Sequence, residues 1–198
     1  MQIYNDIPSS LREMANRELY SDEEIKWLGM PKPRFFTTYS KGAFLFAIPW
    51  TAFALFWVAG AAGFEIPDFQ DGFDLFPLFG LPFVLLGIWM LMTPLFTYRN
   101  ARRTLYMITD RRAVIFEGGS NTTIRTYEPD KLQDMIRKER NNSIGDLVFA
   151  KEFSQKSLIQ DIGFINIEDA KGVEWKIKEM IQNAARREER LERFGRKE

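Results

Sequence analysis

Few side chains in this 198-residue sequence could support catalysis, because it contains no histidine and no cysteine. Cys/His zinc sites, nucleophiles activated by histidine, His-ligated haem and disulfides are therefore excluded. The acidic run Asp22, Glu23 and Glu24 lies beside a predicted helix start, where negative charge favours the helix dipole. Gly118 and Gly119 are predicted to form a turn, since no P-loop or GxGxxG motif is present. We expect no catalytic residue, metal or cofactor; an enzyme whose carboxylates recruit a divalent ion such as Mg²⁺ is an alternative.

Four basic residues that are candidates for contact with lipid headgroups lie beside two apolar segments. Anionic lipid headgroups attract each such cation by about 1 kcal/mol. Two further arginines fall in a predicted turn, for which simple solvation is the alternative explanation. The predicted membrane-interface and headgroup-binding residues are Lys41, Arg99, Arg102, Arg103, Arg111 and Arg112.

The two apolar segments, residues 42–64 and 76–98, carry no charged side chain. No Lys or Arg occurs from 42 to 98, and the four acids there fall together between the segments: Glu65, Asp68, Asp71 and Asp74. Each segment is long enough for the roughly 20 apolar residues that cross a hydrocarbon core, whereas a buried helix of a soluble protein is usually shorter. The sequence predicts a transmembrane hairpin joined by an acidic loop.

The distribution of Lys and Arg also predicts the orientation of this hairpin. Cations flank its outer ends and are missing from its loop, which places both termini in the cytoplasm. Ala59 and Gly63, and likewise Gly80 and Gly87, have spacings that favour close helix packing against the other span or another protein. The alternative is that small residues are simply common in membrane helices.

The segment before the hairpin contains two capping-box patterns. Ser10 with Glu13 and Ser21 with Glu24 each match S/T-x-x-E, which pairs helix-start amides with side chains. We therefore expect two short amphipathic helices, the second ending at Gly29, lying at the membrane interface or on the C-terminal domain.

After the hairpin the pattern changes to the alternation typical of antiparallel strands. Strands are expected at 104–108, 113–116, 124–127, 132–137, 147–149 and 162–167, with a longer loop at 151–160. Short strands at close spacing indicate a small barrel or a curled sheet.

A helix is expected after the last strand, with Asp169 as N-cap. Its apolar stripe consists of Val173, Ile177, Met180, Ile181 and Ala184. The charged residues 185–198 continue it as a solvated extension or as a partner-binding coiled segment.

Residues 104–119, TLYMITDRRAVIFEGG, resemble the opening strands of bacterial pleckstrin-homology-like (PH-like) domains. The T-x-Y-x-I-T-x-x-R pattern is matched by Thr104, Tyr106, Ile108, Thr109 and Arg112. Residues 163–181 are similar to that family's last strand and closing helix, and residues 22–33 to the acidic W-x-G-x-P segment ahead of its membrane hairpin. The resemblance implies a PH-like β-barrel closed by a C-terminal helix; some membrane-anchored members are linked to the assembly or organisation of membrane complexes.

The sequence thus predicts an α+β membrane protein with four parts: an N-terminal amphipathic segment (1–41), a hairpin (42–98), a cytoplasmic PH-like domain (99–184) and a charged helical extension (185–198). We expect a non-enzymatic scaffold or accessory subunit of a complex in the bacterial inner membrane. Its expected partners are membrane lipids and other subunits or copies of itself, with no nucleic acid. The alternative is a module that binds anionic lipid headgroups.

Overall fold

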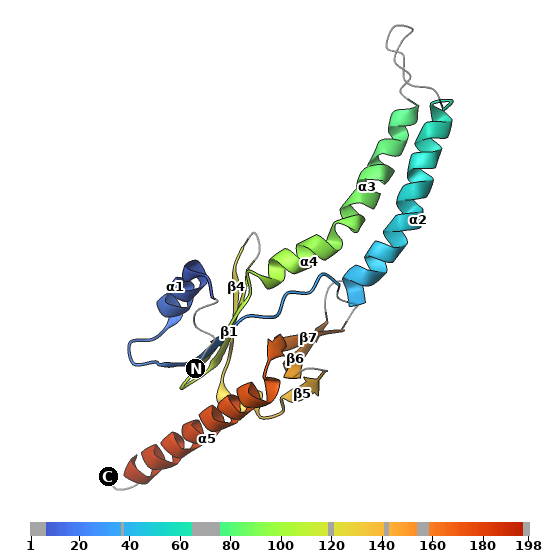
Figure 1. The fold of residues 1–198 in the computed structure, drawn as a ribbon. Helices are drawn as coiled ribbons and strands as arrows, with labels where there is room; N and C mark the ends of the chain where they lie inside the picture. The colour runs from blue at the N-terminus through green and yellow to red at the C-terminus, as the bar shows by residue number, and fades with distance from the viewer. Residues whose placement is uncertain are drawn as a thin grey trace. The chain divides into compact units, whose positions relative to one another are not determined.

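The structure, a computed structural model, describes residues 7–36, 38–64, 76–118, 121–140, 143–153 and 159–195. The fold is α+β, with two antiparallel sheets and two apolar helical segments (Figure 1). The chain forms two compact units: Met1–Pro33 with Asn100–Glu198, and Arg34–Arg99. The predicted acidic loop, the Gly119 end of the Gly118-Gly119 turn and half of the polar stretch 151–160 (residues 154–158) lie outside the described residues.

The first sheet has the strand order β1-β2-β3-β4, and all neighbours are antiparallel. It joins a strand that precedes the apolar hairpin to three strands that follow it. The strands are β1 (Ile25–Gly29), β2 (Leu105–Thr109), β3 (Ala113–Glu117) and β4 (Thr123–Tyr127).

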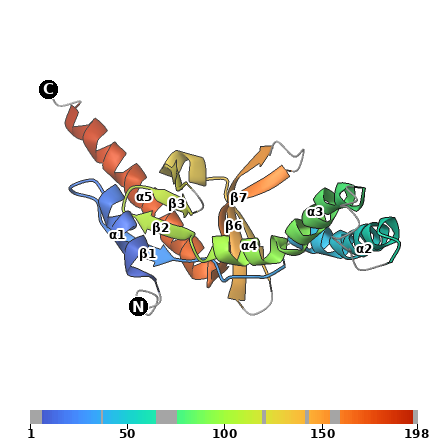
Figure 2. The ribbon, with the colours of Figure 1, turned by 90° about the horizontal axis from the view of Figure 1, so that it is seen from above.

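Strands β2 and β3 are buried on both faces, which explains why their sequences are almost continuously apolar. On one face, Leu105 and Met107 pack in a cluster with Leu11 and Ala15 of helix α1 (Ser9–Glu18). On the other face, Tyr106 and Ile108 of β2 and Ala113 and Ile115 of β3 lie in the main core. Side chains alternate along a strand, so the two helices that flank the sheet, α1 and α5, can bury adjacent residues on opposite sides (Figure 2).

The prediction of a second N-terminal helix was wrong, because the chain forms strand β1 there. Trp27 pairs with Ile108 and Leu28 with Met107, with an irregular register at Lys26. Trp27 enters the main core and Leu28 the α1 cluster. Pairing with β2 and burial on two faces outweigh the local capping signal.

The capping box predicted at Ser10 also does not form. The N-cap of helix α1 is Pro8, two residues before Ser10, and the helix start has no side-chain cap. The backbone amides of Leu11 and Arg12 donate instead to the carbonyl of Pro8. The helix itself was predicted correctly; its start was not.

The second sheet has the order β5-β6-β7. It consists of β5 (Ile136–Glu139), β6 (Ile144–Phe153) and β7 (Ile159–Glu168), and β6 pairs with both others. The strand predicted at 132–137 begins later, because Pro129–Leu132 forms a 3₁₀ turn, η3. Strand β6 is longer than the predicted 147–149 and extends into the expected loop. Among the described residues no strand pairing joins this sheet to the first, so the expected closed barrel is not formed.

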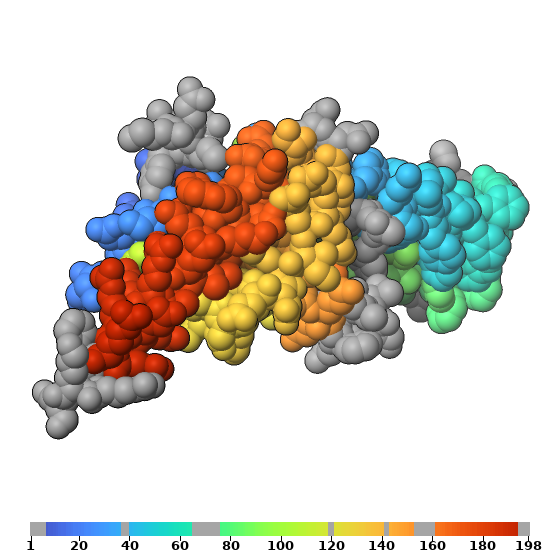
Figure 3. Space-filling view, turned by 90° about the horizontal axis from the view of Figure 1, so that it is seen from below, coloured from blue at the N-terminus to red at the C-terminus, as the bar shows by residue number. Residues whose placement is uncertain are grey.

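Helix α5 (Ala170–Gly195) closes the main core. The Asp169 carboxylate accepts from the Gly172 amide at 3.0 Å, as expected of an N-cap. Val173, Ile177 and Met180 are buried, while the charged second half of the helix is exposed. Figure 3 shows the outer side of α5, in orange to red, beside the yellow and gold surface of residues 121–140 and 143–150.

The unit Arg34–Arg99 is built around a helical hairpin. Helix α2 (Thr38–Ala61) packs against η2 (Pro77–Gly80) and α3 (Leu81–Leu91), and α4 (Thr93–Ala101) follows a break at Met92. Ser40–Ala61 and Pro77–Ala101 are long and apolar enough to cross a membrane, with mean hydropathies of 1.8 and 2.0. The structure therefore contains two candidate spans close to the predicted ranges.

Candidate functional site

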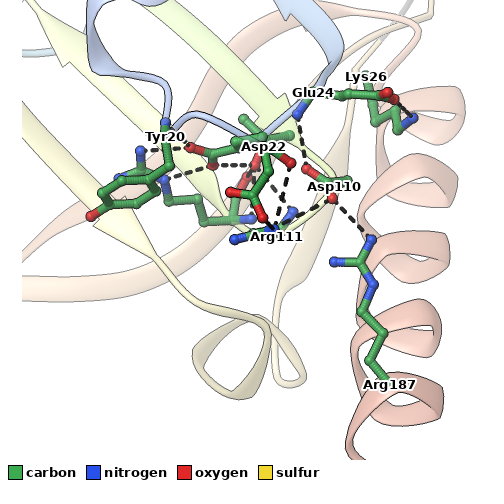
Figure 4. Close-up of polar contacts among 10 residues, drawn as sticks. Tyr20, Asp22, Glu24, Lys26, Asp110, Arg111 and Arg187 are labelled. Carbon is green, nitrogen blue, oxygen red and sulfur yellow. Dashed lines mark hydrogen bonds and ion pairs between the residues drawn. The ribbon is translucent and has the colours of Figure 1, made fainter.

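The turn between β2 and β3 organises the densest group of polar contacts in the described part of the chain (Figure 4). Thr109 directs this turn: its hydroxyl oxygen accepts from the amides of Arg111 and Arg112 at 3.1 and 3.0 Å. The same hydroxyl donates to Glu23 Oε1 at 2.7 Å. The T-x-x-R pattern thus has a structural cause, because Thr109 shapes the turn that presents Arg112.

Arg112 and Glu23 form a buried, two-pronged ion pair. Arg112 Nε lies 2.8 Å from Glu23 Oε1, and Nη2 lies 2.9 Å from Oε2. The side chain of Arg112 is 8% exposed and that of Glu23 is fully buried. Arg112 also donates to the Glu18 carbonyl at 2.7 Å, and its guanidinium lies 4.4 Å from the Tyr20 ring centroid. The two hydrogen bonds between the guanidinium and the carboxylate, together with the Tyr20 ring face, offset the free-energy cost of removing both charges from water.

The surroundings of this ion pair keep both groups charged. Burial alone would raise the pKa of Glu23, but hydrogen bonds from Arg112, the Tyr20 amide and the Thr109 hydroxyl hold that pKa below its ordinary value. The hydrogen bonds to Glu23 raise the pKa of Arg112. A carboxylate and a guanidinium locked in their ionised forms cannot exchange protons with a substrate, so the geometry fits a structural clamp.

Around this clamp lies a more exposed set of charges, also visible in Figure 4. Asp110 accepts from the Glu24 amide at 3.0 Å and from Arg187 of α5 at 2.9 Å. Burial opposes ionisation of Asp110, yet these hydrogen bonds hold its pKa below the ordinary value. Arg111 is hydrogen-bonded to Asp22. One turn therefore connects the N-terminal segment, the first sheet and the closing helix.

The structure separates the six predicted headgroup-binding cations into two groups. Arg112 is buried in its ion pair with Glu23, and Arg111 is exposed but paired with Asp22. The other four are exposed, at the start of α2, in the last turn of α4 and directly after it: Lys41, Arg99, Arg102 and Arg103. Lipid contact by these four stays a prediction.

The predicted helix-packing glycines also behave differently from one another. Gly80 and Gly87 are buried against α2: a Cβ atom on Gly80 would lie 2.3 Å from Val58, and one on Gly87 would lie 2.2 Å from the Thr51 hydroxyl. Their close packing is therefore within the hairpin.

Gly63 is exposed, and a Cβ atom at this position would meet nothing within 4 Å, although Gly63 shares small-residue spacing with half-buried Ala59. It has φ +70° at the end of α2, where its amide donates to Gly60 and the Phe64 amide donates to Ala59. This is a Schellman motif, so helix termination explains Gly63.

Sequence reasoning missed the clamp because its two partners are 89 residues apart. The acidic run was assigned to a helix start, and the T-x-x-R pattern carried a family resemblance but did not indicate a partner for Arg112. Within the described ranges, no group of three or more acidic side chains is arranged to hold a metal ion.

Comparison of this chain with protein-family models, with curated proteins and with solved structures finds no match.

Proposed function

We propose that this protein is a non-enzymatic scaffold or accessory subunit of a membrane complex, anchored by its helical hairpin. The observation that carries the proposal is the exposure of that hairpin. Only 17% of the most apolar window of each candidate span is buried, whereas the core helix of a soluble protein would be mostly buried. Phe53, Phe56 and Leu85 are each more than 60% exposed. Hydrocarbon is the solvent in which such a surface is stable.

The discontinuity of the folded unit supports the proposed topology. Its first part precedes the hairpin and its second part follows it, and they are joined by β1–β2 pairing and by the Glu23–Arg112 ion pair. Both flanks must therefore lie on one side of any membrane that the hairpin crosses, as two spans require. The bias of Lys and Arg makes that side the cytoplasm, and we place the protein in the bacterial inner membrane.

The proposal also retains a PH-like domain. Four-stranded and three-stranded antiparallel sheets and one C-terminal helix on the shared core are the features that support it. The Thr109-x-x-Arg112 turn gives the T-x-x-R motif a structural role in this chain. A small domain held at the membrane surface, whose most buried polar groups serve its own folding, is suited to binding another protein.

Purification of the full-length protein from membranes in mild detergent tests this function. Membranes should retain the protein after washes with high salt and alkaline carbonate, and the purified particle should contain a stable partner subunit or several copies of the chain. Recovery in the soluble fraction would overturn the membrane anchor. A monodisperse particle with one copy and no partner, after cross-linking in intact membranes, would overturn the scaffold function.

The second candidate function is binding of anionic headgroups, and the exposed cations at the hairpin ends favour it: Lys41, Arg99, Arg102 and Arg103. Its test needs the full chain, because a fragment starting at Arg103 lacks β1 and Glu23 and leaves Arg112 unpaired. The full-length protein is placed in nanodiscs of varied lipid composition. Anionic headgroups should shield these four cations from chemical modification, and the shielding should increase with the anionic lipid content. Equal modification in anionic and zwitterionic nanodiscs would overturn this candidate.

A further inference from the structure

A cleft of about 670 Å³ lies between the middle part of α5, residues 176–190, and the turn that follows β2. One wall is a single face of the helix, which carries Lys176, Asn183, Arg186 and Arg190. The opposite wall is formed by the 22–26 segment and by Thr109 and Asp110. The volume falls in the range of small-molecule sites.

The walls of this cleft are fixed by contacts inside the domain. Arg187 of α5 is bonded to Asp110 at 2.9 Å, and Asp110 is bonded through its carboxylate and its amide to the backbone of Glu24. On the helix, Met180 is buried in the main core. The distance between the walls is therefore set by packed elements rather than by mobile side chains.

The charges lining the cleft do not balance. The acids of the wall opposite α5 are each paired with a cation: Asp22 with Arg111, Glu24 with Lys26, and Asp110 with Arg187. On the α5 wall, Lys176, Arg186 and Arg190 form no ion pair with any described residue, and Glu179 is the one acid among them. The residues that line the cleft carry five positive and four negative charges, and Arg111, which lies outside the lining, neutralises Asp22, so two positive charges of the cleft are left without a matching acid.

The placement of these cations is unfavourable for the isolated helix. Arg186 and Arg190 lie one turn apart, where like charges repel. The exposed half of α5 contains several glutamates, yet among described residues neither arginine is paired with one. A bound anion would relieve this repulsion.

We propose that the cleft binds an anion carrying a phosphate group. A phosphate monoester has a charge of about −1.5 to −2 at neutral pH and three acceptor oxygens, which matches the excess charge of the cleft. The forks of Arg186 and Arg190 bind two of its edges, the Asn183 amide donates a further hydrogen bond, and Lys176 contributes a point charge. A soluble phosphate compound and a phospholipid headgroup share this chemistry. The site goes beyond the scaffold function and does not involve the cations at the hairpin ends.

The test uses full-length protein in nanodiscs of phosphatidylcholine, with pyrophosphate as the soluble probe and calorimetry as the measurement. The variant Arg186→Gln with Arg190→Gln should weaken pyrophosphate binding by about tenfold or more, since each arginine makes a charge-assisted hydrogen bond. The matched control, Lys171→Gln with Arg193→Gln, removes the same charge from the same helix outside the cleft and should change affinity less than about twofold.

A second arm replaces part of the phosphatidylcholine with phosphatidic acid and measures protection of Arg186 and Arg190 from an arginine-modifying reagent. Pyrophosphate binding that depends on the cleft supports a soluble ligand, and protection by phosphatidic acid alone supports a headgroup. Equal losses in the cleft and control variants, or no response in either arm, would overturn the site. Circular dichroism and unchanged exchange protection of β2 confirm that both variants fold.

Discussion

Replacing Glu23 with glutamine tests whether the buried ion pair holds the N-terminal segment on the sheet. Glu23→Gln keeps the shape of the side chain but removes the charge that compensates Arg112, whose side chain is only 8% exposed. Removing one partner of a buried pair costs about 3–5 kcal/mol. The Glu18 carbonyl and the Tyr20 ring still contact the guanidinium, so we expect the lower part of this range.

Hydrogen exchange of the β2 and β3 amides in the full-length protein is the suitable assay, because it reports on the folded unit and not on the hairpin. A loss of about 3 kcal/mol increases exchange by roughly 10²-fold wherever exchange requires opening of the β1–β2 pairing. The matched control is Glu24→Gln. Its side chain is 76% exposed and, among the described residues, pairs with Lys26 alone, so exchange should change by less than about threefold.

A double variant distinguishes the effect of leaving Arg112 unpaired from the effect of changing the side chain at position 23. Glu23→Leu with Arg112→Met removes both charges together, and replacing both members of a buried pair by apolar groups is often close to neutral. The double variant should therefore exchange more slowly than Glu23→Gln. If Glu23→Gln behaves like Glu24→Gln, or if the double variant is as unstable as the sum of its two single variants, the clamp does not work as described.

Three further predictions concern pH, the core and the hairpin. Folding lowers the pKa of Glu23, so the stability that this carboxylate contributes is present above its ordinary pKa of about 4.5 and is lost as pH falls through the folded value. The difference in exchange protection between wild type and Glu23→Gln should therefore be full at pH 7 and should shrink below about pH 4.5. A difference that does not change with pH would contradict the ionised pair. Phe164→Ala should destabilise the folded unit by about 3–5 kcal/mol in denaturant titrations, because this fully buried ring contacts three other rings, whereas exposed Trp175→Ala should have little effect. Gly87→Leu should separate α2 from α3 and abolish cross-linking between cysteines placed on the two helices. The control is Gly42→Leu, because a Cβ atom at Gly42 has no neighbour within 4 Å. Equal cross-linking in both variants would contradict the packing.

Local pattern was sufficient to predict the apolar helices, the first β-hairpin and the closing helix. The uncharged stretches, the alternation around Tyr106 and Ile115, and the stripe of Val173 and Ile177 each depend on neighbours close in sequence. These local patterns predict the folded structure correctly because the tertiary contacts of the same residues favour the same helices and strands. They also explain why β2 and β3 were located almost to the residue.

The N-terminal segment could not be predicted in this way. Ser21 and Glu24 form a plausible capping box, but Trp27 and Leu28 have partners on β2 that lie about eighty residues further along the chain. The extended state is favoured only once β2 offers a free edge, and no local pattern contains that information.

The same limit applies to the candidate site. Arg112 was predicted to contact a lipid headgroup, yet its partner in the structure is Glu23. An arginine in a turn looks exposed in sequence, and its burial is decided by Thr109 and by the docking of the 18–23 segment. Gly63 illustrates the reverse case, because its spacing fits a packing motif while its positive φ ends a helix.

The discontinuous domain also constrains how this protein can be made. During translation β1 emerges before the apolar helices, and β2 emerges after them, so Glu23 remains without Arg112 until the hairpin has been synthesised. In the proposed membrane topology, the domain therefore closes only after both apolar helices have been synthesised. An insertion error that leaves one helix out of the bilayer puts β1 and β2 in different compartments, and such a chain cannot complete its first sheet.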